Sequence, residues 1–264
     1  MTADPRYYMS ARLADAYAFH RPPIHAAIWA RVAAASSIEE RVTDALDVGC
    51  GAGASTAALA AYAREVTGVD PSEAMLRRAR QALPDASFVL GRSDALPLAD
   101  ATYALVAAAG SLNYADPSAA LAEISRVMRP LGRFVAYDFS TGHVDAAGEA
   151  ASFRSFREGF ASLSGYSLDL KALPFVRHAF RLTAWEEFEL RVPMSFQAYL
   201  EYILGETNVE ATIVGGMSES EARAICSAAF ETLFSGRDRE IRFRAVFAVA
   251  QKTATVARPL SSNL

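Results

Sequence analysis

The chain of 264 residues contains only two cysteines, Cys50 and Cys226, so it can build neither a disulfide framework nor a thiolate metal site. No apolar run approaches the ~18 residues of a membrane-spanning helix, and residues 1–6 do not lead into the apolar core of a signal peptide. The net charge is −4 and no block of five basic residues occurs, which argues against nucleic acid as the main partner. We therefore expect a cytoplasmic globular protein, monomer or homodimer, with a small-molecule substrate, no metal and no membrane partner.

Short apolar segments alternate with helical segments between residues 40 and 140. This alternation predicts a mostly parallel sheet with helices on both faces, which is a doubly wound α/β fold. The predicted strands are 44–49, 65–70, 86–90, 103–109 and 133–139, and the predicted helices are about 54–63, 72–82 and 117–129.

The flanking segments follow different patterns. Residues 7–35 predict two helices separated at Arg21-Pro22-Pro23. Beyond residue 140 we expect helices at 146–165, 195–204 and 218–233 and strands at 178–192 and 239–251, which bring the sheet to seven strands. The expected organisation is a helical lid over 1–39, an α/β core over 40–140, a substrate cap with the penultimate strand over 141–235, a final core strand over 236–252 and a flexible tail over 253–264.

A glycine turn follows the first predicted strand. The stretch Ala45-Leu46-Asp47-Val48-Gly49-Cys50-Gly51-Ala52-Gly53 ends an apolar strand, places glycine at every second position and leads into a helix. Open α/β sheets bind nucleotide-like ligands at such turns, because glycine lets a ligand lie directly against the backbone. The pattern Gly49-x-Gly51-x-x-Ala54 also loosely fits a dinucleotide fingerprint. The carboxylate of Asp47 argues against that reading, because it would face phosphates with a like charge.

Three carboxylates recur at or near strand ends. Asp47, Asp70 and Asp94 are separated by 23 and 24 residues, close to one β-α unit each. Such positions converge on the crevice at the carboxyl edge of a doubly wound sheet. Asp70 is suitably placed to accept hydrogen bonds from ribose hydroxyls. The set therefore favours a ligand that carries a ribose and positive charge.

Together these segments resemble the motifs of class I S-adenosylmethionine-dependent methyltransferases, with a Rossmann-like fold. The resemblance implies that the glycine loop holds the methionyl part of the cofactor, that Asp70 binds the ribose, and that Met75 and Asp94 contact the adenine. The cofactor residues that it implies are Arg21, Asp47, Gly49, Cys50, Gly51, Gly53, Asp70, Pro71, Met75, Ser93, Asp94, Ala95, Ala109 and Gly110.

The segment Ala14-Asp15-Ala16-Tyr17-Ala18-Phe19-His20-Arg21-Pro22 is similar to the N-terminus of the small-molecule methyltransferases that include trans-aconitate methyltransferase. In that group an Arg before Pro reaches the carboxylate of the cofactor, which implies this role for Arg21. The loop Ala109–Tyr114 stands where that group usually has His-Trp, and here it ends in Asn113 and Tyr114. This departure leaves the substrate and the role of a base at that position open.

Aromatic side chains are frequent outside the predicted core, and they favour an apolar or aromatic substrate. The expected substrate-binding residues are Tyr8, Tyr17, Phe139, Tyr166, Trp185, Tyr199 and Tyr202. Of the candidate bases His20, His25, His143, His178, Asp138 and Glu206, we favour His20, because it adjoins Arg21. The expected catalytic set is His20, Asn113 and Tyr114.

The expected function is methyl transfer to a small metabolite by in-line displacement, with O-, C- and N-methylation all open. A second hypothesis is a biosynthetic cyclase or decarboxylase that binds S-adenosylmethionine without methyl transfer. An interaction or sensor protein without turnover and an NAD-dependent enzyme remain weaker alternatives.

Overall fold

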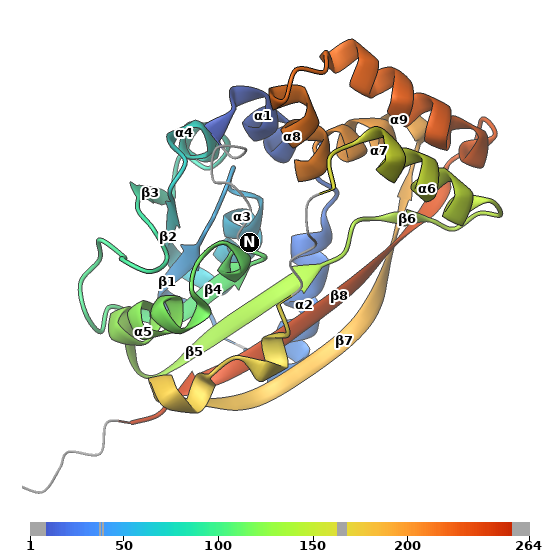
Figure 1. Ribbon diagram of the computed structural model, residues 1–264. Coiled ribbons are helices and arrows are strands. Elements are labelled where there is room, and N and C mark those ends of the chain that lie inside the picture. Colours follow the sequence, from blue (N-terminus) through green and yellow to red (C-terminus); the bar gives the residue numbers. More distant parts are fainter. Residues whose placement is uncertain (1–8, 37, 39, 163–167, 255–264) are drawn as a thin grey trace, which may run out of the picture.

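The computed structural model describes residues 9–36, 38, 40–162 and 168–254. Within these residues, strands run in the order β3-β2-β1-β4-β5-β8-β6, and β7 pairs with the other edge of β8 (Figure 1). Strands β1 to β5 are mutually parallel, whereas β8 runs antiparallel to its neighbours. The strands are β1 (Val42–Val48), β2 (Ala63–Asp70), β3 (Ser87–Leu90), β4 (Tyr103–Ala109), β5 (Met128–Phe139), β6 (His143–Val144), β7 (Phe180–Met194) and β8 (Arg239–Lys252).

The chain leaves β1 toward β2 and β3 on one side, and β4 and β5 lie on the other side. The order therefore reverses between β1 and β4. A crevice forms at this point because the connections that leave the two neighbouring strands run in opposite directions.

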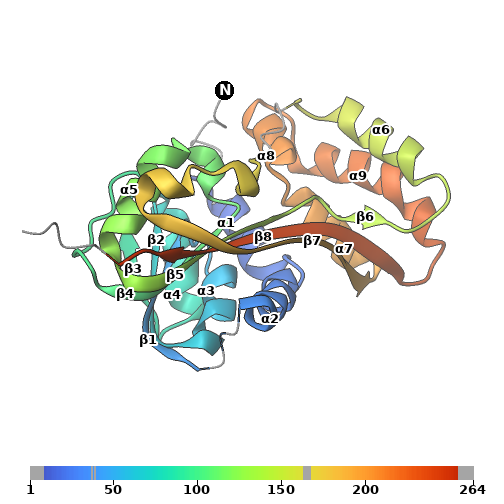
Figure 2. The same cartoon turned by 90° about the horizontal axis from the view of Figure 1, so that it is seen from below.

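Helices cover both faces of the sheet. Figure 2 views the long strands β7 and β8 nearly edge-on, with α5 on one side, α2 and α3 on the other, and α6, α7 and α9 around one end of these strands. The helices are α1 (Ala11–Phe19), α2 (Ile24–Ser36), α3 (Ala54–Leu59), α4 (Glu73–Ala82), α5 (Pro117–Val127), α6 (Glu149–Gly159), α7 (Phe196–Leu204), α8 (Thr207–Val214) and α9 (Glu219–Phe234). None of the helices within the described ranges is long and apolar enough to cross a lipid bilayer.

Successive strand residues point to opposite faces, and they divide between two hydrophobic cores. Leu46, Val106 and Phe134 pack beneath α5, whereas Ala45 and Val135 pack toward α2 and the cap helices. Because both faces are covered, most buried residues of the central strands are apolar, as in the run Leu105 to Ala108 of β4. This composition made them recognisable in the sequence.

The expected strands and most expected helices are confirmed, with three differences. Residues 207–214 form α8, which the sequence did not suggest, and the two residues of β6 add an eighth strand. Of the helix expected over 146–165, residues 149–159 are helical, residues 146–148 and 160–162 are not, and residues 163–165 lie outside the described residues. The described order of elements is that of a doubly wound, mostly parallel α/β sheet with helices at the N-terminus and an inserted helical cap.

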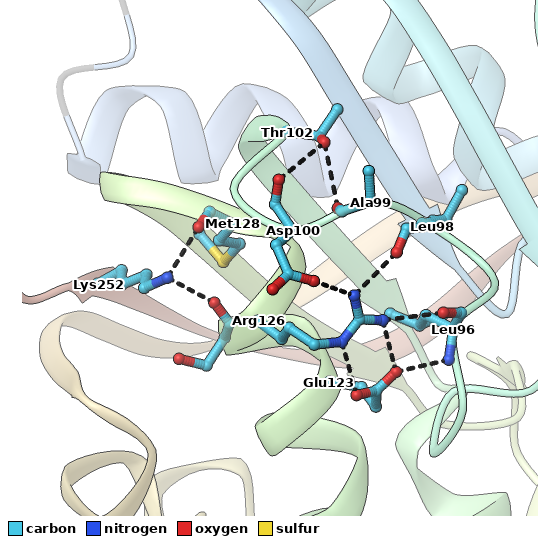
Figure 3. A network of polar contacts seen from close by, with 10 residues as sticks. Leu96, Leu98, Ala99, Asp100, Thr102, Glu123, Arg126, Met128 and Lys252 are labelled. Carbon is cyan, nitrogen blue, oxygen red and sulfur yellow. Dashed lines mark hydrogen bonds and ion pairs between the residues drawn. The ribbon is translucent and has the colours of Figure 1, made fainter.

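A polar network fixes the loop that follows β3 (Figure 3). The guanidinium of Arg126 donates to the carbonyl oxygens of Leu96 and Leu98, at 2.9 and 2.8 Å. The carboxylate of Glu123 pairs with Arg126 and accepts the backbone N–H of Leu96 at 2.8 Å. Charge-assisted bonds of this kind are roughly twice as strong as neutral ones. The network therefore attaches to α5 the loop that carries Asp94.

Candidate cofactor and substrate site

A cavity of about 350 Å³ opens at the carboxyl ends of the parallel strands. Its floor comes from the loops after β1, β2, β3, β4 and β5, and its roof from α1, the start of α2, and the junction of α7 and α8. The lining residues are 9, 17, 21, 25, 49–52, 54–55, 70–71, 75, 91–94, 109–111, 113–115, 138–141, 202 and 206–207.

The glycine turn after β1 requires a backbone conformation that other residues rarely adopt. Gly49, Gly51 and Gly53 have φ angles of +73°, +52° and +96°. The N–H of Gly49 donates to the carbonyl oxygen of Val69 at 2.7 Å, which holds the turn against β2. A Cβ atom on Gly49 would lie 2.2 Å from Cβ of Ser111, whereas a Cβ on Gly51 would meet no atom within 4 Å. Gly51 therefore presents bare backbone to the cavity.

Asp47 lies beneath this turn and does not line the cavity. Its side chain is fully buried, and Oδ2 accepts hydrogen bonds from the hydroxyls of Ser55 and Thr56 at 2.6 and 2.7 Å. Burial raises the pKa of Asp47 to about 6, against the effect of these two hydrogen bonds. The expectation that Asp47 faces a charged ligand is therefore corrected, because its carboxyl group holds the start of α3 instead.

Asp70 joins the end of β2 to the glycine turn. Its Oδ2 accepts the N–H of Gly51 and its Oδ1 accepts the N–H of Ser72, both at 2.9 Å. Burial raises the pKa of Asp70, and the two backbone bonds oppose that shift. Each oxygen keeps a lone pair, so the carboxylate can also accept hydrogen bonds from a ligand in the cavity.

The far end of the cavity offers an apolar side chain beside a polar loop. Met75 is 2% exposed and reaches the cavity from α4. Asp94 accepts hydrogen bonds from Nε and Nη2 of Arg92, at 2.9 and 2.7 Å. The hydrogen bond and charge of Arg92 lower the pKa of Asp94, so its carboxylate stays ionised. This end could accept a flat ring with hydrogen-bond donors at its edge.

Arg21 closes the roof. Its guanidinium donates to Glu206 at 2.9 Å and lies 4.2 Å and 5.2 Å from the ring centroids of Tyr17 and Tyr202. Glu206 also accepts the hydroxyl of Thr141 at 3.0 Å. The charge of Arg21 is thus already balanced by the cap, and a ligand carboxylate would share this cation with Glu206.

His25, the second residue of α2, is part of the cavity wall. Its Nδ1 lies 2.9 Å from the hydroxyl oxygen of Tyr137, and its ring meets Phe139 edge-on with centroids 5.4 Å apart. Burial, together with the positive charge of Arg21, lowers the pKa of His25 to about 4. The imidazole is therefore neutral at physiological pH.

Asp138 lines the same part of the cavity from the end of β5. Its oxygens accept the side-chain amide of Asn113 at 3.1 Å and the N–H of Phe139 at 2.8 Å. Burial raises the pKa of Asp138. Asn113 thus serves to orient a carboxylate, a role that its sequence position alone did not suggest.

Most predicted site residues converge on this cavity, but several do not. His20 is exposed at the end of α1, Trp185 is 39% exposed on β7, and Tyr199 is buried with its hydroxyl bonded to the carbonyl oxygen of Gly142. The structure does not bring these three residues into the lining of the cavity. Gly53 and Ala95 also lie outside the lining, and Tyr8 and Tyr166 fall outside the described residues. His25 and Asp138 were candidate bases but were not preferred. The available signals were that His25 follows Arg21-Pro22-Pro23 and that Asp138 lies at the end of the fifth strand.

A reversal of strand order, a glycine turn, an acid at the end of the adjacent strand and a cavity that spans them define an α/β protein that binds a nucleoside-bearing ligand. Residues 46–136 match the family model described as a methyltransferase domain. This match, together with the fold and the site, supports a class I S-adenosylmethionine-dependent methyltransferase domain in this part of the chain, and S-adenosylmethionine is the cofactor of that class.

The similar proteins support this family at the level of the domain. An uncharacterized methyltransferase of Mycobacterium tuberculosis is 37% identical over 120 residues, which are 45% of this chain and 46% of the relative. Demethylmenaquinone methyltransferase of Renibacterium salmoninarum is 38% identical over 96 residues, which are 36% of this chain and 40% of that protein. The matches thus span less than half the length of these relatives.

Among solved structures, a candidate type II methyltransferase from Anaeromyxobacter dehalogenans superposes with a TM-score of 0.64 and 23% identity. The superposition covers 87% of this chain and 97% of that one. At this identity the likeness concerns the fold, and it confirms the expected methyltransferase-type α/β architecture.

Proposed function

We propose that this protein transfers a methyl group from S-adenosylmethionine to a small, mainly apolar or aromatic metabolite. The single observation that carries the proposal is that one cavity connects the open backbone at Gly51 and the carboxylate of Asp70 with a wall of Tyr17, Phe139 and Tyr202. One ligand-binding space thus has a nucleoside end and an aromatic end.

The residues of the nucleoside end fit S-adenosylmethionine. Asp70 has lone pairs for ribose hydroxyls, Met75 offers an apolar surface for the adenine, and Asp94 can accept the adenine amino group. The bare backbone at Gly51 leaves room for the methionyl part, and the fixed turn Gly49–Gly53 would hold it.

When bound, S-adenosylmethionine supplies a methyl group on a positively charged sulfur. The chain itself has to orient the acceptor and exclude water, which can lower a barrier by several kcal/mol. Tyr17, Tyr202 and the Arg21–Glu206 pair close the roof over the aromatic end, so they would shield the reacting groups from solvent.

The charges of the cavity argue against a polycarboxylate substrate such as trans-aconitate. Asp70 and Asp138 line the cavity without a cationic partner in the described part of the chain, whereas Arg21 and Arg92 are paired with Glu206 and Asp94. An anionic acceptor would meet uncompensated negative charge. We therefore favour a neutral acceptor, and the likeness to the trans-aconitate group remains a prediction.

Two measurements test the proposed function. Calorimetric titration should give saturable one-to-one binding of S-adenosylhomocysteine, and incubation with methyl-labelled S-adenosylmethionine and a panel of hydroxylated aromatic compounds should label at least one of them. Cofactor binding with product formation but without label transfer would instead favour the cyclase or decarboxylase hypothesis, which no contact in the described site favours. Absence of cofactor binding would refute both.

A further inference from the structure

Two polar side chains of the cavity have no assigned part in holding the cofactor. His25 enters from α2 and Asp138 from the end of β5, and both belong to the aromatic end of the cavity. Phe139, Tyr17 and Tyr202 provide the apolar surface around them. The polarity of the two groups determines which substrate atoms they can bind.

The hydroxyl of Tyr137 fixes the proton on the ring of His25. Tyr137 is 1% exposed, and burial raises its pKa well above the usual value, so the phenol keeps its proton. Within the described residues, Nδ1 of His25 is the one acceptor at hydrogen-bond distance from this hydroxyl. If Nδ1 were the donor instead, the buried phenolic proton would lose its partner, at a cost of roughly 1–3 kcal/mol. Tyr137 therefore donates, Nδ1 carries no proton, and the neutral ring has its N–H at Nε2.

Asp138 is a hydrogen-bond acceptor, whereas His25 offers a donor. Its carboxylate accepts from Asn113 and from the backbone of Phe139, and these two bonds leave lone pairs on both oxygens. The two arginines of the described lining, Arg21 and Arg92, are paired with Glu206 and Asp94. A ligand O–H in the cavity could therefore donate to Asp138.

We propose that His25, through Nε2–H, and Asp138, through its carboxylate, select substrates that carry both a carbonyl oxygen and a hydroxyl group on an apolar or aromatic frame. The proposal rests on the proposed function, because the cofactor must occupy the nucleoside end and leave this part of the cavity to the substrate. Hydroxylated aromatic ketones belong to this class. Simple phenols, simple ketones and polycarboxylates each lack one of the two groups or bring the wrong charge.

The protonation of His25 can be observed directly by nitrogen NMR on protein with labelled histidine. The chain has four histidines, so the His25 signal is assigned as the one lost in His25→Gln. At neutral pH we expect a proton on Nε2 and none on Nδ1, and in Tyr137→Phe we expect a mixture of the two neutral tautomers. A proton on Nδ1 of the unaltered protein would overturn the inference without reference to any ligand.

The selectivity is tested with small probes on protein saturated with S-adenosylhomocysteine. The 2-, 3- and 4-hydroxyacetophenones are titrated, and the best isomer is compared with the ethylphenol that lacks the carbonyl and the methoxyacetophenone that lacks the hydroxyl. Loss of one hydrogen bond should weaken each comparison compound about fivefold. Failure of all three hydroxyacetophenones to bind, or equal binding of the comparison compounds, would contradict the proposal.

Matched variants assign each preference to a side chain. The double variant His25→Phe with Tyr137→Phe removes both partners of the His25–Tyr137 hydrogen bond, so neither keeps a polar group that needs the other, and it should abolish the preference for the carbonyl. Asp138→Asn keeps the size of the side chain and should reduce the preference for the hydroxyl to below twofold. Both variants should bind S-adenosylhomocysteine as the unaltered protein does.

If Asp138→Asn weakens the binding of S-adenosylhomocysteine as strongly as the binding of the probes, Asp138 belongs to the cofactor site and the inference is wrong. If the unaltered protein fails to bind S-adenosylhomocysteine, the proposed function fails, and the NMR result still decides the protonation of His25.

Discussion

Two glycines of the same turn should respond in different ways to one added methyl group. Gly49 and Gly51 both have positive φ, so alanine costs roughly 1–2 kcal/mol of backbone strain at either position. At Gly49 the new Cβ would also lie 2.2 Å from Cβ of Ser111, whose hydroxyl donates to the carbonyl oxygen of Val48 at 2.5 Å. Overpacking adds about 1–3 kcal/mol and the lost hydrogen bond about 1 kcal/mol. Gly49→Ala should therefore destabilise the protein by about 3–6 kcal/mol.

At Gly51 the added methyl group meets no protein atom, so only the backbone strain remains. At about 2–4 °C per kcal/mol, Gly51→Ala should lower the Tm by about 2–8 °C and Gly49→Ala by clearly more. Because Gly51 lines the cavity, its alanine variant should nevertheless bind S-adenosylhomocysteine at least tenfold more weakly, on the order of 1.4 kcal/mol. Differential scanning calorimetry and a binding titration on both variants give the comparison. Normal ligand affinity in Gly51→Ala, or equal destabilisation by both changes, would refute the reasoning.

Two further predictions concern buried charges. Asp47 has its pKa raised from 3.8 to about 6, so its contribution to stability is fully present below about pH 4 and is lost as the pH rises through 6, by at most about 3 kcal/mol. Urea unfolding should therefore show Asp47→Asn gaining stability relative to the unaltered protein between pH 4 and pH 8, and a constant difference would contradict the burial argument. Glu206→Gln leaves the largely buried guanidinium of Arg21 without its counter-charge and should cost about 1–3 kcal/mol in thermal unfolding. The control Asp15→Asn breaks the more exposed pair with Arg78 and should cost less than about 1 kcal/mol. Equal costs for the two variants would contradict the claim that burial makes the Arg21–Glu206 pair more important for stability.

The parallel strands could be predicted from sequence because each is a short apolar run that ends at a polar or glycine residue. The site at their carboxyl ends followed from Gly51, Asp70 and Asp94. These positions depend on local pattern and on the topology of α/β sheets, and both are visible in a single sequence.

The residues that the sequence could not place depend on how distant segments pack. The sequence favoured His20, which adjoins Arg21, whereas in the structure the contact of His25 in α2 with Tyr137 in β5 places His25 at the cavity. The inward turn of Asp47 depends on two hydroxyls, Ser55 and Thr56, at the start of the next helix. That pair was a usable signal, because adjacent hydroxyls can satisfy a buried carboxyl group. The helix α8 has no comparable signal in its sequence.

The central claim is that Asp70 and the open glycine turn form the nucleoside end of a methyltransferase site. Calorimetric titration of S-adenosylhomocysteine tests it most directly, on the unaltered protein, on Asp70→Ala and on the control Glu65→Gln, an exposed acid of the same strand. We expect saturable binding to the unaltered protein and to Glu65→Gln, and affinity at least tenfold lower in Asp70→Ala. Equal affinity in all three proteins, or no binding to the unaltered protein, would contradict the claim.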